Sequence, residues 1–316
     1  MKKLCAMIVV LFALSLSVVA LDYPKKNVTV IVPYGAGGTT DLSVRALIDS
    51  IPDGEVPKGV SFLVTNMPGG SGLLGMNKYV TSKKDGYTIG LVNCDFLLNS
   101  VKGVTPLKLE QFVPLVFVQA DPYLVLVKAD APYQTFQEFV EYVRANPGKV
   151  KMGDSGSGTV PYFAIVAMQK ALGLDVKTMS YDTSLESTLA VVRDEVQATV
   201  AHSGACIGQL EAKTVKALAV TSNERLTLFP EIPAIGELYS EASEMRVLSW
   251  IAVAALEGTP PEILDYLRGI FTKSVKSDAF KTRIKAFHMQ EVNMFTSEDM
   301  NAFFEGQAAY YKKNLE

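Results

Sequence analysis

Apolar, β-branched runs alternate with segments of helical spacing in the first part of the chain. The runs at 27–34, 60–70 and 85–93 predict strands, and the apolar spacing at 40–51 and 72–83 predicts two helices between them. Strands that alternate with helices in this way form a parallel sheet covered by helices.

The alternation continues through the rest of the chain without a flexible linker. Further strands are predicted at 123–130, 149–158, 176–181, 198–203, 215–222 and 247–256, and further helices at 135–148, 161–172 and 184–196. Two such halves predict a two-lobed α/β protein whose ligand binds in a cleft at the carboxyl ends of the strands.

Two predicted helices carry start signals. Thr135 and Glu138 have the spacing of a capping box, in which each side chain caps backbone near the other. Thr259 and Glu262 have the same spacing, and Pro261 between them suits the first turn of a helix. Both sites therefore predict helix N-termini.

The N-terminal segment differs from the rest of the chain. Lys2 and Lys3 precede an uncharged apolar run from Leu4 to Leu21 that contains small residues near its end. This order predicts a secretory signal peptide, residues 1–20, cut after Ala20. The alternative is a membrane anchor, because the run is just long enough to span a bilayer.

Composition adds few constraints. The chain has 316 residues, 48% of them apolar and 20% charged, which is ordinary for a globular protein. The formal net charge of -3, or -5 without Lys2 and Lys3, gives no sign of a nucleic-acid partner. Beyond the leader only Cys94 and Cys206 remain, and we expect two separate buried thiols rather than a disulfide.

A glycine-rich turn, Tyr34 to Asp41, joins the first strand to the first helix. It contains no lysine, arginine or histidine. A helix N-terminus exposes backbone N–H groups and a partial positive charge, so this turn can hold a carboxylate or phosphate without a basic side chain. The Thr39 hydroxyl can add a donor, and Asp41 can cap the first turn.

Two weaker interpretations of this turn stay open. Gly35, Gly37 and Thr40 nearly match the dinucleotide fingerprint, but threonine is bulkier than the third small residue required there. The turn can also be a tight strand–helix connection that binds nothing. A nucleotide P-loop is excluded, because no Gly-Lys-Ser/Thr sequence follows.

Two further turns of small residues also join a predicted strand to a predicted helix. One places Gly69, Gly70 and Ser71 at a helix start, and the other, within 153–159, is rich in serine and glycine. Three such turns at strand ends predict a pocket that grips an anion from several sides.

Several segments together resemble one known family. They are YPKKNVTVIVPYGAGGTTDLSVR, NMPGGSGLLGMNKYVTSKKDGYTIGL, GSGTVPYFA, VKALAVTSNERLTLFPEIPAIGEL and WIAVAALEGTPPEIL. In this order they are similar to the substrate-binding receptors of tripartite tricarboxylate transporters, the Bug-type receptors. The resemblance covers nearly the whole chain after residue 20.

The resemblance implies a two-lobed type II periplasmic-binding-protein fold, with mixed sheets covered by helices and a ligand cleft between the lobes. Residues 21–122 and 248–316 would form the first lobe and residues 123–247 the second. It implies an exported, periplasmic receptor that binds a small carboxylate, such as a di- or tricarboxylate, and delivers it to the membrane subunits of such a transporter. No cofactor, metal ion, catalytic residue or nucleic acid is expected, and the chain should be a monomer.

The resemblance also implies a set of ligand-binding residues. Carried over from the pocket segments of the family, they are Tyr34, Gly37, Gly38, Thr39, Asp41, Gly69, Gly70, Ser71, Cys94, Ser155, Gly156, Ser157, Thr159, Tyr181, Asp182, Thr183, His202 and Ser203. Asp182 stands where the family often has lysine, and Ala201-His202-Ser203 where it often has Phe-Asp-Asn. These departures leave the ligand, and whether it carries an amine, open. Cys94 would lie in a loop that flanks the cleft.

An exported enzyme on the same two-lobed scaffold, such as a small-molecule hydrolase, is the main alternative. It would use Cys94 or Cys206 as a thiol nucleophile with His202 as its base, but no sequence motif supports this pairing. Cys206 and His202 are also spaced like two metal ligands, but no further ligands cluster with them.

Overall fold

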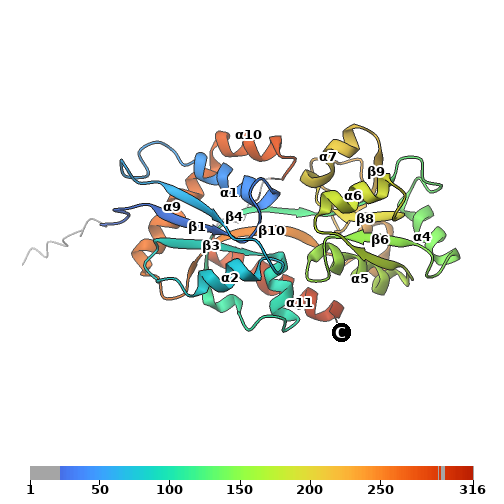
Figure 1. The fold of residues 1–316 in the computed structure, drawn as a ribbon, viewed down its shortest axis with the longest axis horizontal. Coiled ribbons are helices and arrows are strands. Elements are labelled where there is room, and N and C mark those ends of the chain that lie inside the picture. Colours follow the sequence, from blue (N-terminus) through green and yellow to red (C-terminus); the bar gives the residue numbers. More distant parts are fainter. Residues whose placement is uncertain (1–21, 291, 293–295, 316) are drawn as a thin grey trace, which may run out of the picture.

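The structure is a computed structural model that describes residues 22–290, 292 and 296–315, and the predicted leader, residues 1–20, lies outside them. Figure 1 shows two lobes side by side, each with a central sheet covered by helices. We call the lobe that contains strand β1 the first lobe and the other the second lobe. In the described part of the chain no helix combines the length and the apolar character that a membrane span requires.

The first lobe is built on a five-stranded mixed sheet. In the order β2-β1-β3-β10-β4, its strands are Phe62–Asn66, Val28–Val32, Thr88–Asn93, Leu248–Leu256 and Phe112–Pro122. As the strand–helix alternation predicts, β1 pairs in parallel with β2 and β3, whereas β10 runs antiparallel to β3 and β4. The helices of this lobe are α1 Thr39–Asp49, α2 Leu73–Val80, α3 Cys94–Val101, α9 Pro261–Lys276 and α10 Asp278–Ala286, with the short 3-10 turn η1 Leu109–Gln111 before β4.

The second lobe repeats this plan. In the order β7-β6-β8-β5-β9, its strands are Lys177–Ser180, Lys151–Asp154, Ala198–Ala201, Leu124–Lys128 and Val215–Val220. β6 pairs in parallel with β7 and β8, and β5 runs antiparallel to β8 and β9. Its helices are α4 Phe136–Ala145, α5 Val160–Leu172, α6 Ser184–Val192 and α7 Ser203–Glu211, and the return to β10 carries α8 Ile235–Leu238 and η2 Ser240–Ala242.

Short strand connections and the last helix join the lobes. β4 ends at Pro122 and β5 begins at Leu124, so Tyr123 alone separates strands of different sheets. Helix α11, Ser297–Leu315, contacts α3 and β4 in the first lobe and α5 in the second. The last segment thus touches both lobes, and the division of the chain at residues 122 and 247 stays a prediction.

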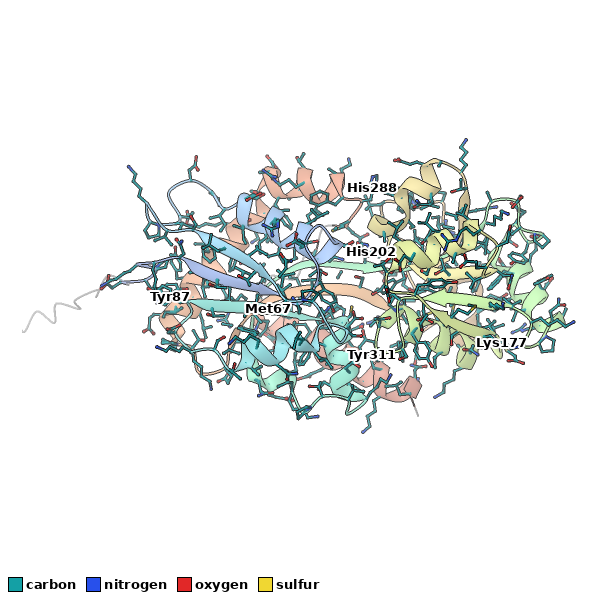
Figure 2. All side chains as sticks on the ribbon, viewed as in Figure 1. Met67, Tyr87, Lys177, His202, His288 and Tyr311 are labelled. Carbon is teal, nitrogen blue, oxygen red and sulfur yellow. The ribbon has the colours of Figure 1, made fainter. Side chains whose placement is uncertain are left out.

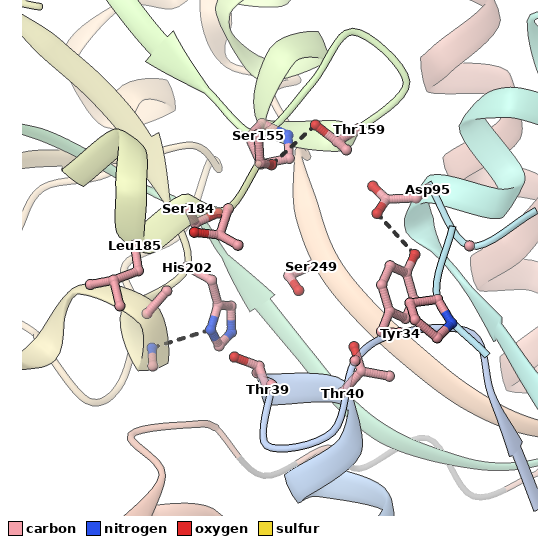
Figure 3. A pocket seen from close by; sticks show the side chains of 18 of the residues that line it. Tyr34, Thr39, Thr40, Asp95, Ser155, Thr159, Ser184, Leu185, His202 and Ser249 are labelled. Carbon is pink, nitrogen blue, oxygen red and sulfur yellow. Dashed lines mark hydrogen bonds between the residues drawn. The ribbon is translucent and has the colours of Figure 1, made fainter. Parts of the chain in front are cut away.

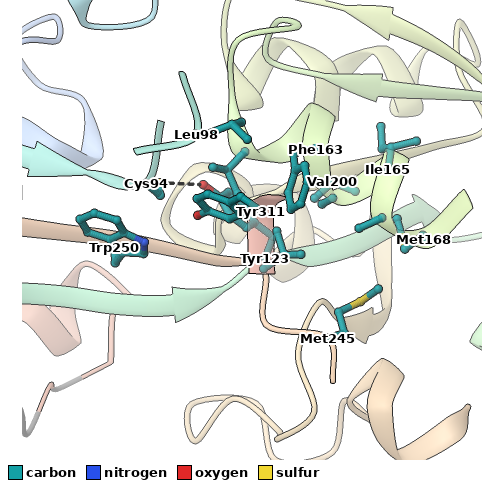
Figure 4. Close-up of a cluster of buried hydrophobic side chains, with 14 of the residues drawn as sticks. Cys94, Leu98, Tyr123, Phe163, Ile165, Met168, Val200, Met245, Trp250 and Tyr311 are labelled. Atoms are coloured by element: carbon teal, nitrogen blue, oxygen red, sulfur yellow. Dashed lines mark hydrogen bonds between the residues drawn. The ribbon is translucent and has the colours of Figure 1, made fainter. Parts of the chain in front are cut away.

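Buried aromatic side chains continue the apolar core from one lobe into the other (Figure 4). The ring centroids of Tyr311 in α11 and Phe163 in α5 are 5.0 Å apart. Those of Trp250 in β10 and Phe304 in α11 are also 5.0 Å apart. All four are buried, and burying a large apolar side chain contributes roughly 1.5–3 kcal/mol. The two lobes are therefore packed together on the side formed by α3, α5 and α11.

Of the two predicted capping boxes, the structure contains only the first. The capping box at α4 is confirmed, because Thr135 Oγ1 accepts the Glu138 N–H and the Glu138 carboxylate accepts the Thr135 N–H, each at 3.2 Å. The second box is wrong. α9 begins at Pro261 as predicted, but the Thr259 hydroxyl donates to the carbonyl of Leu256 at 2.8 Å rather than capping the helix.

The sequence pattern did not predict strand β4 or helix α11. It also did not predict helices α3 and α7. Cys94, expected in a loop, is the first residue of α3, and Asn93 caps this helix by accepting the Phe96 N–H at 3.0 Å. Both α3 and α7 follow a strand with at most one intervening residue, so no glycine or proline marks their starts.

Candidate functional site

A cavity of about 730 Å³ lies between the lobes. Its lining comes from the turn after β1, the turn after β2, the start of α3, the turn after β6 and the starts of α6 and α7 (Figure 3). All six lie at junctions where a strand leads into a helix, and residues of β4 and β10 together with Tyr123 complete the lining. The predicted location of the cleft, at the carboxyl ends of strands, agrees with this lining.

The turn after β1 presents open backbone donors to the cavity. Gly35 to Thr40 all line it, and the N-cap of α1 is Gly38, which has no side-chain cap. Within the described chain, the N–H groups of Thr39, Thr40 and Asp41 have no hydrogen-bond acceptor. The first turn of α1 therefore retains the donors and the partial positive charge that an anion requires.

Asp41 braces this turn from behind instead of lining the cavity. Its buried carboxylate accepts hydrogen bonds from the Gly37 N–H at 2.8 Å, from Asn66 Nδ2 at 2.9 Å and from Arg45 Nε at 2.9 Å. Burial acts to raise the pKa of Asp41, but the bonds from Arg45, Gly37 and Asn66 outweigh it and lower the pKa. The Gly37 N–H and the Arg45 charge are therefore both directed to Asp41.

The turn after β2, which lines part of the cavity, has an unusual backbone conformation. Gly69, Gly70, Ser71 and Gly72 all have positive φ, and three of them line the cavity while Gly70 does not. A side chain at Gly72 would lie 3.2 Å from the Tyr34 ring, so this position requires glycine for space as well as for its φ of 87°. The two glycine turns of the first lobe thus pack against each other.

Asp95 connects the lobes at the back of the cavity. Tyr34 donates its hydroxyl proton to Asp95 Oδ2 at 3.0 Å (Figure 3). The Tyr34 hydroxyl also accepts a hydrogen bond from Asn93 Nδ2 at 2.5 Å. Asp95 Oδ1 accepts the N–H of Val160, the first residue of α5, at 2.9 Å. Burial raises the pKa of Asp95 to about 6, and the bonds from Val160 and Tyr34 offset part of that rise.

The turn after β6 is held by its own hydroxyl groups. Ser155 Oγ lies 3.2 Å from Thr159 Oγ1, which donates to the Gly156 carbonyl at 2.7 Å. Ser155 and Thr159 line the cavity, whereas Gly156 and Ser157 do not.

His202 is the N-cap of α7 and faces a buried carboxylate. Its Nδ1 accepts the Gly204 N–H at 3.2 Å, and its Nε2 lies 3.3 Å from Asp121 Oδ2 and 3.2 Å from Gln119 Nε2. His202 and His288 both lie where the lobes meet, and only His202 lines the cavity (Figure 2). With Nδ1 accepting, Nε2 is the nitrogen left to carry a proton toward Asp121.

Among the residues that the structure describes, no lysine or arginine lines the cavity. Its charged side chains in the described chain are Asp95 and Asp182, and its apolar ones include Leu42, Leu185 and Ile251. The groups that could face an anion here are backbone N–H groups, hydroxyl groups, the Gln119 and His202 side chains and the helix dipoles.

The family model described as "Tripartite tricarboxylate transporter family receptor" (TctC) matches residues 57–315. The chain belongs to this receptor family.

Two relatives of the receptor come from Bordetella pertussis. A UPF0065 protein is 28% identical over 296 residues, which cover 90% of this chain and 87% of the relative. BugT is 27% identical over 297 residues, which cover 92% of this chain and 89% of BugT. The resemblance to the Bug-type receptors is thereby confirmed.

Solved structures share the fold of the receptor. A ligand-free TctC solute-binding protein from Polaromonas is 26% identical with a TM-score of 0.77, covering 93% of this chain and 99% of that chain. MatC from Rhodopseudomonas palustris, with bound malate, is 20% identical with a TM-score of 0.79, covering 93% and 100%. A second R. palustris protein, with adipate, is 23% identical with a TM-score of 0.78, covering 93% and 97%. The expected two-lobed periplasmic-binding-protein fold is confirmed.

The receptor brings most of the predicted ligand-binding residues into one cavity. Those that line it are Tyr34, Gly37, Gly38, Thr39, Gly69, Ser71, Ser155, Thr159, Asp182, Thr183 and His202. Those that do not line it are Asp41, Gly70, Cys94, Gly156, Ser157, Tyr181 and Ser203. That any of them binds ligand stays a prediction.

Three residues outside the lining have other contacts. The Tyr181 hydroxyl donates to Glu195 at 3.3 Å, and the Ser203 hydroxyl donates to the carbonyl of His288 at 2.7 Å. Cys94 is buried behind Asp95, 3.8 Å from the Tyr123 hydroxyl. These side chains support the walls of the cavity.

Several residues that line the cavity were not predicted from the sequence. They include Asp95, Gln119, Tyr123, Ser184, Leu185 and Ser249. Asp95 had one local signal, since it lies in the first turn of a helix that Asn93 caps. Gln119, Tyr123 and Ser249 lie on or next to β4 and β10, and only the crossing of the chain between lobes places them in the cleft.

Cys94 and Cys206, the cysteines among the described residues, are free and buried, as expected. Burial raises the pKa of Cys94 above its ordinary range and that of Cys206 to about 12. Burial therefore disfavours the thiolate form of both cysteines. Among the described residues, no group of three or more His, Cys, Asp and Glu is placed to hold a metal ion.

Proposed function

We propose that the receptor binds a small organic carboxylate in the cleft between its lobes and delivers it to the membrane subunits of a tripartite tricarboxylate-type transporter. One carboxylate of the ligand binds the N-terminus of α1. The two lobes close around it on the side that α1, α6 and α7 form.

The open N-terminus of α1 carries this proposal. Three N–H groups without acceptors, at Thr39, Thr40 and Asp41, lie in or behind a turn that lines the cavity. Hydroxyl groups of Thr39 and Thr40 lie beside them (Figure 3). A carboxylate supplies four lone-pair sites and suits this concave arrangement of donors better than a neutral ligand does.

The relatives support a carboxylate as the ligand class. MatC holds malate and another R. palustris protein holds adipate, and both share the fold of the receptor. The family description supports a transporter as the partner. The predicted signal peptide supports a periplasmic location, where ligand and membrane subunits can meet.

A binding and turnover assay tests this function. Purified protein without residues 1–20 is titrated with a panel of mono-, di- and tricarboxylates while its melting temperature and the composition of the mixture are followed. We expect saturable stabilisation by at least one carboxylate with no product formed. Stabilisation by none of them contradicts the proposed function, and product formation favours the enzyme.

A matched pair of variants ties the binding to the cleft. Gly38 has a φ of -75°, and an added Cβ there lies no closer than 3.4 Å to its nearest neighbour, so Gly38→Val folds while narrowing the approach to α1. Gly269, in α9, has open space around it and lies outside the lining. We expect Gly38→Val to abolish the stabilisation and Gly269→Val to retain it.

A further inference from the structure

Side chains on one face of helix α3, in the first lobe, form hydrogen bonds with the start of α5 and the turn before it, in the second lobe. Asp95 accepts the Val160 N–H at 2.9 Å, Asn99 Nδ2 donates to the Gly158 carbonyl at 2.7 Å, and Lys102 Nζ donates to the Ser157 carbonyl at 3.1 Å. Side chains four and then three residues apart lie on one side of a helix. The Asp95 contact is therefore one part of a three-residue interface between the lobes.

The N-terminus of α5 has few donors left for a ligand. The Thr159 N–H bonds to the Gly156 carbonyl at 3.0 Å, the Val160 N–H is taken by Asp95, and Pro161 has no N–H. Of the first groups of this helix, only the Tyr162 N–H remains without an acceptor in the described chain. By contrast, the first turn of α1 retains three. The carboxylate of Asp95 thus occupies the anion position that α5 offers.

The charges of the cavity lining also disfavour a second ligand carboxylate near α5. Asp95 and Asp182 line the cavity, and no lysine or arginine in the described part of the chain does. A ligand carboxylate near α5 would face the Asp95 carboxylate without a compensating cation, and like charges in a partly buried site repel strongly. An ammonium group there would face a carboxylate whose Oδ2 accepts only the Tyr34 hydroxyl and can accept a second bond.

We infer that Asp95 restricts the receptor to ligands with a single carboxylate and a distal ammonium group, that is, zwitterionic amino acids without an acidic side chain. The carboxylate binds α1, and the ammonium binds on the Asp95 side of the cavity. This inference rests on the proposed function and narrows its ligand class. Two observations support it. The N-terminus of α1 has free N–H groups, whereas the N-terminus of α5 already binds the Asp95 carboxylate.

Length-matched probes test this specificity by calorimetry. At four carbons they are succinate, 4-aminobutanoate and butanoate, and at six carbons adipate, 6-aminohexanoate and hexanoate. For at least one length, we expect the amino acid to bind about tenfold or more tightly than the dicarboxylate, with the monocarboxylate between them. A dicarboxylate that binds as tightly as the amino acid overturns the inference and leaves the proposed function standing. Binding of none of the six also overturns the inference, and the proposed function fails with it only if no member of the wider carboxylate panel stabilises the protein.

Two acid-to-amide variants test the role of Asp95. Asp95→Asn keeps the shape and the acceptor for Val160 but removes the charge, so the ratio of the two affinities should shift toward the dicarboxylate by about tenfold. Asp182 is exposed at the mouth of the cavity, and Asp182→Asn should change the ratio less. An unchanged ratio in Asp95→Asn overturns the inference.

The wild-type protein offers a measurement that does not depend on any variant. The groups that face Asp95 include the hydroxyl groups of Tyr34, Tyr123 and Tyr311, the Cys94 thiol and the Val160 N–H. Burial raises the pKa values of the three tyrosines and the cysteine. Asp95 is therefore the facing group that titrates, at about 6. The preference for the amino acid over the dicarboxylate should grow as pH rises through that value. A preference that does not change with pH contradicts the assignment.

Discussion

The backbone N–H of Gly37 donates a hydrogen bond to the Asp41 carboxylate at 2.8 Å, across the turn that opens α1. Gly37 has a φ of 78°, a conformation that favours glycine, so the turn depends on both residues. Asp41 lies outside the cavity lining but holds the backbone whose donors face it.

Removing this brace should weaken both fold and binding. Asp41→Ala loses three hydrogen bonds to a buried carboxylate, and we expect the free energy of unfolding to fall by about 2–3 kcal/mol. Ligand affinity should fall by about tenfold, because the α1 donors lose their alignment. The control is Asp49→Ala at the exposed end of the same helix, where unfolding should change by less than about 1 kcal/mol. Equal effects of the two variants would refute the bracing role.

The raised pKa of Asp95 predicts a characteristic dependence of stability on pH. The folded state holds this proton up to about pH 6, whereas the unfolded chain releases it at the ordinary value of 3.8. The stabilisation from protonating Asp95 is thus fully present below the unfolded pKa and is lost as pH rises through about 6, a change of about 2–3 kcal/mol. Denaturant unfolding of wild type and Asp95→Asn should show the variant gaining relative stability between these pH values. A constant difference would mean that Asp95 does not titrate in this range.

The two cysteines should react only after unfolding. Cys94 and Cys206 are free and buried, and burial disfavours their thiolate forms. Titration of native protein with a thiol reagent should proceed slowly, whereas unfolded, unreduced protein should show both thiols at once. If unfolded protein shows no thiol, the cysteines are bridged, contrary to the structure.

Ligand binding should bring the lobes closer together on the side opposite α3, α5 and α11. α3, α5 and α11 hold the lobes together on one side, and the cavity lies between α1 of the first lobe and α6 and α7 of the second. Small-angle scattering should therefore show a smaller radius of gyration at saturating ligand. Gly38→Val, which narrows the ligand's approach, should show no such change. An unchanged radius for saturated wild-type protein would count against closure.

Local signals were sufficient to predict most of the fold. β-branched runs marked β1, β3 and β5, and the Thr135–Glu138 capping box marked the start of α4. Parallel pairing of β1 with β2 and β3 followed from the helices between them. These elements depend on periodicity and turn chemistry within short segments, which a sequence shows directly.

The site required tertiary information as well. The glycine turns could be located from the sequence because small residues there follow a strand. The contacts of Asp41 could not: its carboxylate accepts the Gly37 N–H and lies outside the cavity lining. Asp95 was missed because its role depends on Val160, 65 residues away, which reaches it only when the lobes pack. Thr259 was assigned to a cap from its spacing, but its hydroxyl bonds to the carbonyl of Leu256 instead.

The central claim is that the first turn of α1 holds a carboxylate through backbone donors, without a cationic side chain. Calorimetry with one ligand as its acid and as the neutral amide of the α1-bound carboxyl group tests this claim most directly. Each hydrogen bond to a charged group contributes roughly 1.5–3 kcal/mol, so the amide should bind about tenfold to a hundredfold more weakly. Thr39→Val should cost less than this, because the backbone donors remain, and Gly38→Val should cost at least as much. If the amide binds as tightly as the acid, the α1 turn is not an anion site, and its glycines serve only the path of the chain.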